Sequence, residues 1–110
     1  MNFRLDPTAN STGTGWMTDI EVAPATIARV FGSAYVAGGF KVTREYIFVA
    51  EDGRVFTLFD SKATCHWEPG LPEAEEFWAS TKPAEFCVGA IDEDVQEFAE
   101  WLRIVLPGAV

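Results

Sequence analysis

The chain has 110 residues, of which 48% are hydrophobic and 14% aromatic, and it carries a formal net charge of −9. This length and apolar content are typical of one folded domain with its own core, over residues 1–110, and argue against a disordered chain. The deficit of lysine and arginine excludes the usual basis of nucleic-acid binding, because a chain that binds phosphates must replace their counterions.

Residues 7–15, PTANSTGTG, are turn-forming or small polar residues, so we expect 1–15 to form a flexible N-terminal arm. The stretch 16–22 is strand-like. Pro24 stands where helices commonly begin and Gly32 where they commonly end, which predicts a short helix over 24–31.

The strongest local signal is a β-hairpin. Residues 40–50 and 54–60 are rich in β-branched and aromatic side chains, and Asp52-Gly53 between them is typical of a two-residue turn. This turn places Glu45 opposite Asp60 on the paired strand. Large apolar residues then occur on both faces, so each face is expected to be at least partly covered.

The last third predicts a helix over 73–80, a third strand over 85–91 and a final helix over 93–106 with Asp92 as its N-cap. The apolar residues of the final helix recur at helical spacing. We therefore expect an α+β fold: a small antiparallel sheet built on the central hairpin, with the C-terminal helix packed on one face.

The predicted register gathers four charged residues at the end of the hairpin away from its turn. This cluster could bind a small phosphorylated ligand or a partner loop, or form only a surface ion-pair network. Arg44, on the opposite face, could anchor a phosphate or carboxylate, or stack on an aromatic ring. The candidate binding residues are Lys41, Arg44, Glu45, Asp60 and Lys62.

A second candidate surface is acidic. The segment 68–100 contains ten acidic residues and one lysine, and charges elsewhere balance. Such a patch complements a basic protein surface, although it could serve solubility alone. Two apolar residues of the last helix lie off its core stripe, so they could contact a partner or a second copy, or be covered by the short helices or the arm. The candidate partner surface comprises Glu93, Asp94, Glu97, Glu100, Trp101 and Ile104.

Neither catalysis nor a metal is expected. His66 is the single histidine, and with Cys65 and Cys87 it gives too few ligands for a closed zinc site. No nucleophile stands in a recognisable catalytic motif, so no cofactor is expected either. The N-terminus lacks a secretory signal and no run is long enough to span a membrane, which predicts a cytoplasmic protein. The two cysteines are then expected as free thiols, with a bridge between them as the alternative.

Three stretches resemble small bacteriophage-encoded proteins with the pattern FG…KVTxE(W/Y)…DGxxFTLYDxK. They are Phe31-Gly32, KVTREY over 41–46 and DGRVFTLFDSK over 52–62, and the resemblance extends over about residues 27–102. The chain departs from the pattern at Ser33, at Phe59 and at Cys87, where proline, tyrosine and histidine are common. The resemblance implies a phage origin and the host cytoplasm as location, and small phage proteins often inhibit host or defence machinery.

The resulting hypothesis is a phage-type acidic binding protein that inhibits a bacterial host or defence protein by direct contact. One alternative is a sponge that sequesters a nucleotide or signalling molecule on Lys41, Arg44 and Lys62. Another is a structural or assembly factor that associates with itself.

Overall fold

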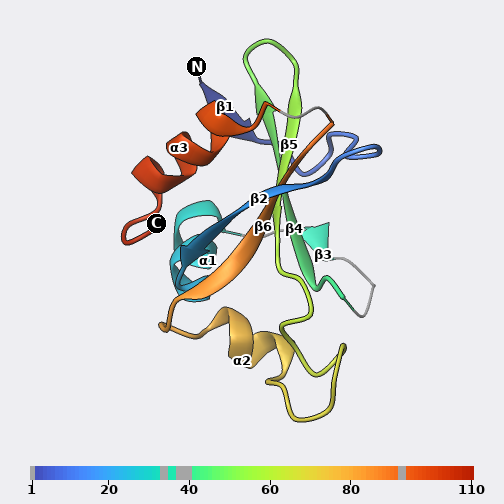
Figure 1. Cartoon of the computed structure of the whole chain (residues 1–110), viewed down its shortest axis with the longest axis vertical. Coiled ribbons are helices and arrows are strands. Elements are labelled where there is room, and N and C mark those ends of the chain that lie inside the picture. The colour runs from blue at the N-terminus through green and yellow to red at the C-terminus, as the bar shows by residue number, and fades with distance from the viewer. Residues whose placement is uncertain (1, 33–34, 37–40, 92–93) are drawn as a thin grey trace.

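The structure is a computed structural model that describes residues 2–32, 35–36, 41–91 and 94–110 (Figure 1). The chain folds into an antiparallel sheet with helices packed on one side, so the expected α+β class is confirmed. The strands are β1 Phe3–Leu5, β2 Gly15–Val22, β3 Tyr35–Val36, β4 Arg44–Ala50, β5 Val55–Phe59 and β6 Ala84–Ala90, and the helices are α1 Pro24–Phe31, α2 Ala74–Trp78 and α3 Gln96–Val105. Within the described residues, no helix has the length and apolar character needed to cross a lipid bilayer.

The strands lie in the order β1-β4-β5-β6-β2, and β3 pairs with the same edge of β4 as β1 does. Since β1 and β2 follow each other in the chain but lie at opposite edges, residues 6–14 must pass from one edge to the other. Asp6 N donates to the Ile47 carbonyl at 2.8 Å, and Ser11 Oγ donates to Glu45 Oε1 at 3.0 Å. The expected flexible arm over 1–15 is therefore corrected at residues 3–5, which form a strand of the sheet and bury Phe3.

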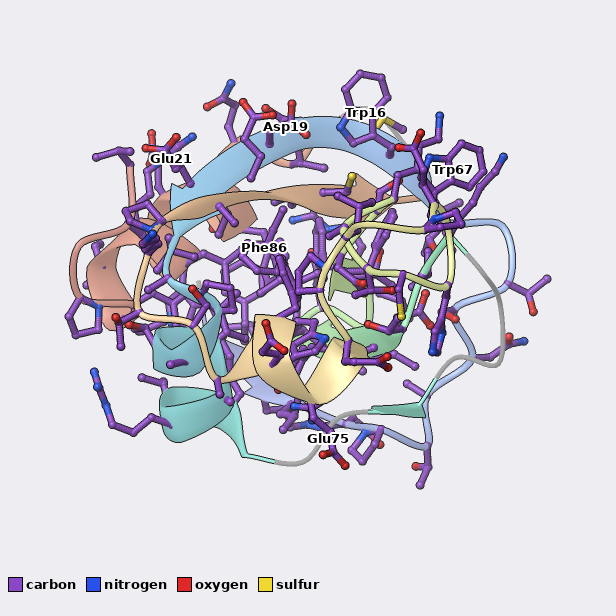
Figure 2. All side chains as sticks on the ribbon, turned by 90° about the horizontal axis from the view of Figure 1, so that it is seen from below. Trp16, Asp19, Glu21, Trp67, Glu75 and Phe86 are labelled. Atoms are coloured by element: carbon purple, nitrogen blue, oxygen red, sulfur yellow. The ribbon has the colours of Figure 1, made fainter. Side chains whose placement is uncertain are left out.

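The two faces of the sheet differ in what covers them. Alternate residues of β4, β5 and β6, among them Phe86 and Val88, point to an inner face. The helices and the hydrophobic core lie on that face. In the part of the chain that the structure describes, no helix covers the opposite, outer face. Figure 2 shows Phe86 inside the molecule, whereas Trp16, Asp19 and Glu21 project from β2 away from it.

The hairpin forms, but with a register one residue away from the prediction. Tyr46 pairs with Leu58, and Ala50 N donates to the Arg54 carbonyl at 2.9 Å, so the loop has three residues, 51–53. Gly53 closes this loop with a φ of 90°, which glycine adopts without strain. A shift of one residue turns every side chain of the second strand to the other face. Asp60 is consequently buried and does not lie opposite Glu45.

Helix α3 begins later than predicted, and its tryptophan is partly buried. Its N-cap is Val95, which makes no side-chain cap, so the expected helix start at 93 is wrong; Asp92 itself lies outside the described residues. Trp101 packs against Phe3 of β1 and Phe31 of α1, with ring centroids 5.3 and 6.0 Å apart. The N-terminal strand thus covers Trp101, as the alternative interpretation held.

Candidate functional site

A β-bulge in β2 determines which way Trp16 points. Trp16 pairs with Gly89 and Thr18 pairs with Val88, which leaves Met17 as an extra residue in β2. Bulges of this kind re-aim a side chain. In a regular strand, Met17 would take an outward position and Trp16 would point inward as Ile20 does. Because the bulge takes Met17 out of this alternation, the indole lies on the outer face, and its Nε1 donates to Asp19 Oδ1 at 2.7 Å. The Trp16 side chain is 62% exposed.

A cavity of about 350 Å³ opens beside this tryptophan, on the outer face of β2, β6 and the end of β5. Its lining combines aromatic rings with carboxylates and a thiol. We call it the outer-face pocket, and its residues are Trp16, Asp19, Phe59, Ser61, Glu85, Phe86 and Cys87.

The outer-face pocket has an excess of negative charge. Asp19 pairs with Cys87, and Glu21 pairs with Glu85 across the same two strands. Two like charges directly opposite each other are unfavourable in a sheet. Among the described residues, no lysine or arginine lies at ion-pair distance from Asp19, Glu21 or Glu85. A cation from outside would therefore relieve a repulsion that the fold leaves in place.

The buried and negatively charged surroundings change the pKa of the Cys87 thiol. Burial, with the carboxylates of Asp19, Asp60 and Glu85 adding to it, raises the pKa of Cys87 to about 11, against an ordinary value of 9.0. At pH 8 the thiolate fraction is then about 0.1%, compared with about 10% for the ordinary thiol.

We accordingly expect Cys87 in the folded protein to react with iodoacetamide at pH 8 on the order of 100-fold more slowly than in the denatured chain, measured by peptide mass spectrometry. Asp19→Asn should speed the reaction of Cys87, because it removes a nearby negative charge. Equal rates in the folded and denatured chains would contradict the assignment.

The structure separates the charged residues that the sequence placed together at the hairpin end. Asp60 lies in the interior, where its carboxylate accepts the N–H groups of Thr43 and Arg44 at 2.9 and 3.0 Å and the Thr43 hydroxyl at 2.7 Å. Trp78 Nε1 donates to that same hydroxyl at 2.9 Å. Glu45 lies on the outer face, where its carboxylate accepts the hydrogen bond from the Ser11 hydroxyl. The predicted cluster around Glu45 and Asp60 is therefore wrong, because the register differs by one residue.

The three basic residues of that prediction lie against aromatic rings. The Arg44 guanidinium lies 5.0 Å from the centre of the Trp78 ring, in the stacked arrangement considered as an alternative to an anion anchor. The ammonium groups of Lys62 and Lys41 lie 4.8 and 5.8 Å from the Trp67 ring. Lys41 and Lys62 thus remain together, since both ammonium groups lie over the same ring and Lys62 N donates to the Lys41 carbonyl at 2.7 Å.

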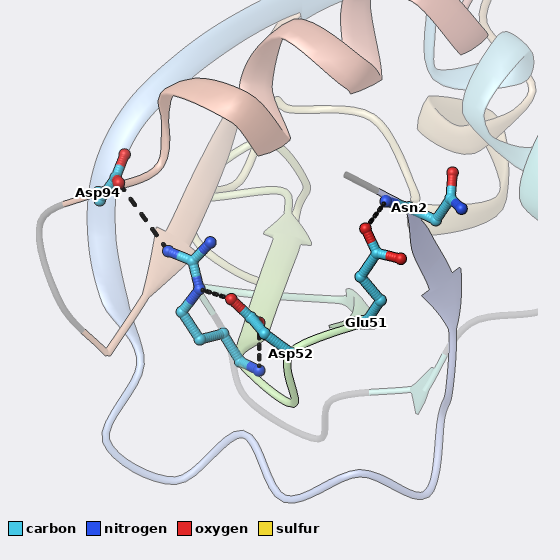
Figure 3. A network of polar contacts seen from close by, with 5 residues as sticks. Asn2, Glu51, Asp52 and Asp94 are labelled. Carbon is cyan, nitrogen blue, oxygen red and sulfur yellow. Dashed lines mark hydrogen bonds and ion pairs between the residues drawn. The ribbon is translucent and has the colours of Figure 1, made fainter.

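The acidic partner surface predicted on the last helix is only partly assembled. Glu97, Glu100 and Ile104 are exposed on α3, but Trp101 is partly buried against the core, and Glu93 lies outside the described residues. Asp94 lies 3.9 Å from Arg54, which also contacts Asp52 in the hairpin loop (Figure 3).

The acidic residues of the last third also do not gather on one surface. Those of α2 and α3 lie at opposite ends of the molecule (Figure 1), and Glu85 lies on the outer face between them.

The cysteines and histidine do not form a site. Cys65 and Cys87 are free thiols, and the described residues contain no group of histidine, cysteine and acidic side chains placed to hold a metal ion. The comparisons with known protein families and with curated proteins give no match to this chain.

Sequence reasoning missed the outer-face pocket. Asp19 and Glu21 alternate with Ile20 and Val22, which marks one face of β2 as exposed. Nothing in the pattern of residues 15–18 reveals the bulge, and a regular strand would turn Trp16 towards the core. The pocket also depends on which strands are neighbours, since Phe59, Cys87 and Asp19 come from three separate strands or strand ends.

Proposed function

We propose that this chain is a small acidic binding protein that inhibits a bacterial protein by occupying a basic site on its surface. The observation that carries the proposal is the outer-face pocket, in which the exposed Trp16 and the half-buried Phe59 adjoin carboxylates that no described lysine or arginine neutralises. The bacterial target and the inhibitory outcome rest on the phage-like sequence pattern. The net charge of −9 supports a basic partner, because opposite charge accelerates association and disfavours wrong partners.

Arginine and lysine are the side chains that match this pocket best. A cation above an indole or phenyl ring is attracted by the electrons of the ring, and a guanidinium also pairs with a carboxylate through two hydrogen bonds. Trp16 and Phe59 supply the rings, and Asp19 and Glu85 supply the carboxylates. A cavity of about 350 Å³ holds the end of such a side chain together with part of its methylene stem.

The test compares two variants with equal loss of charge. In Asp19→Asn/Glu85→Gln the pocket loses both carboxylates, whereas Glu75→Gln/Glu76→Gln removes two exposed carboxylates from α2, away from the pocket (Figure 2). Each tagged protein is used to capture partners from bacterial lysate, and the affinity for the captured protein is then measured by calorimetry at low and high salt.

We expect the pocket variant to bind at least about tenfold more weakly and the α2 variant to bind like the original protein. The affinity of the original protein should fall as salt rises, because salt screens the attraction between exposed charges. Equal affinities for the two variants, or an affinity independent of salt, would refute the proposal.

A second candidate function is the sequestration of a nucleotide. The two lysine ammonium groups beside Trp67 favour it, since a base can stack on the indole while the lysines bind phosphate. Titration with ATP, GTP and cyclic dinucleotides should then show binding that Lys41→Ala/Lys62→Ala abolishes. Unchanged binding in that variant would eliminate this candidate.

A further inference from the structure

Strand β2 is an edge strand with one side partly unpaired. On one side it pairs with β6 along its length. On the other side, Glu21 exchanges two hydrogen bonds of 3.0 Å with Val110, Glu21 N donating to the Val110 carbonyl and Val110 N donating to the Glu21 carbonyl. The backbone groups of Glu21 therefore point away from β6.

The same direction applies to Asp19. In antiparallel sheets, alternate residues present their N–H and C=O groups to the same side. Asp19 lies two residues from Glu21 in the regular part of the strand, so its backbone groups also point outward. No described residue forms a backbone hydrogen bond with Asp19 on that side. An open donor and acceptor thus stand next to the outer-face pocket.

An exchange of two hydrogen bonds is the signature of an antiparallel pair, so Val110 already begins a further strand along this edge. A residue placed opposite Asp19 would continue the strand that Val110 begins. A residue paired there would project its side chain to the same face as Asp19, which is the outer face.

We propose that an extended basic segment of the partner adds to this edge as an antiparallel strand opposite Asp19, with an arginine or lysine side chain reaching into the outer-face pocket. Neighbouring strands lie about 4.8 Å apart, and an extended arginine side chain is longer than that distance. The ladder is short, because the bulge at Met17 interrupts the regular edge. The inference rests on the proposed function and specifies how the partner would be held.

The charge of the edge selects the occupant. Natural edge strands often carry lysine, which discourages pairing with other chains. Strand β2 has no lysine, arginine or proline, and its outward side chains include Asp19 and Glu21. A second copy of this chain would place the same carboxylates against them, which is repulsive. A basic segment brings the opposite charge.

The probe is a capped heptapeptide of alternating arginine and threonine, with arginine at both ends. Two matched peptides carry N-methyl groups, one on every arginine amide and the other on every threonine amide. Arginine side chains that face the pocket come from residues whose N–H groups point to β2, so only the first peptide loses the proposed bonds. Affinity is measured by Trp fluorescence and calorimetry with the full chain.

We expect the parent and the threonine-methylated peptides to bind alike and the arginine-methylated peptide to bind at least about tenfold more weakly. Hydrogen exchange of the Asp19 amide should slow only with the first two. If all three peptides bound equally, and if Asp19→Asn/Glu85→Gln weakened the binding of each to the same extent, the added strand would be overturned. The proposed function would stay intact, because the pocket would still bind arginine. Failure of the parent peptide to bind would overturn both.

Discussion

Replacing Asp60 with alanine is expected to lower the free energy of unfolding by about 3–5 kcal/mol. The carboxylate is fully buried and accepts three hydrogen bonds, from the amides of Thr43 and Arg44 and from the Thr43 hydroxyl. Alanine leaves these buried or partly buried donors without an acceptor. It also removes the acceptor that orients the hydroxyl bonded by Trp78.

Urea unfolding monitored by circular dichroism measures this loss. Asp60→Asn should have an intermediate effect, because its amide oxygen keeps one acceptor while its NH₂ group faces the Thr43 hydroxyl. Asp52→Ala, in the exposed hairpin loop, is the control and should change stability far less. If Asp60→Ala unfolded at the same urea concentration as the original protein, the buried network would not contribute to stability.

The second large effect is expected at Phe98, whose replacement with alanine should cost about 3–5 kcal/mol. Phe98 is fully buried, and its ring centre lies 5.2 Å from those of Phe3 and Phe48 and 4.8 Å from that of Phe56. It therefore joins α3 to β1, β4 and β5. Its loss leaves a void where α3 meets these three strands.

Phe98→Ala should also speed hydrogen exchange in β1, because Phe3 loses one of its ring neighbours. Ile104→Ala provides the matched control: it lies on the same helix, but its side chain is 81% exposed. Thermal unfolding and exchange mass spectrometry measure both effects. Equal stabilities of the Phe98 and Ile104 variants would show that α3 does not anchor the N-terminal strand.

The sequence predicts the presence of the hairpin but not its register. Both a two-residue and a three-residue loop satisfy the signal of Asp52-Gly53, and the two loops differ by one residue. Apolar residues lie on both faces of these strands, so the hydrophobic pattern does not choose between them. Only the burial of Asp60, which depends on Thr43 and Trp78, reveals which register holds.

Other differences arise from contacts between distant segments. Strand β1 has three residues and β3 has two, which is too short for a periodic signal. A helical wheel places Trp101 off the stripe of α3, but it cannot show that Phe3 and Phe31 approach from elsewhere. The helix over 24–31 was predicted correctly because Pro24 and Gly32 mark its ends locally. The direction of Trp16 in the candidate site depends on the bulge in β2, and no local residue pattern predicts that bulge.

The bulge at Met17 has a consequence for variation in chain length. An extra residue that is accommodated outside the ladder can be removed without turning its neighbours over. If position 17 were deleted, Trp16 would precede Thr18 directly, and ordinary alternation would still place the indole beside Asp19. Sequences that lack one residue at this point would therefore keep Trp16 beside Asp19. An alignment that penalises the gap would score them as less similar in structure than they are.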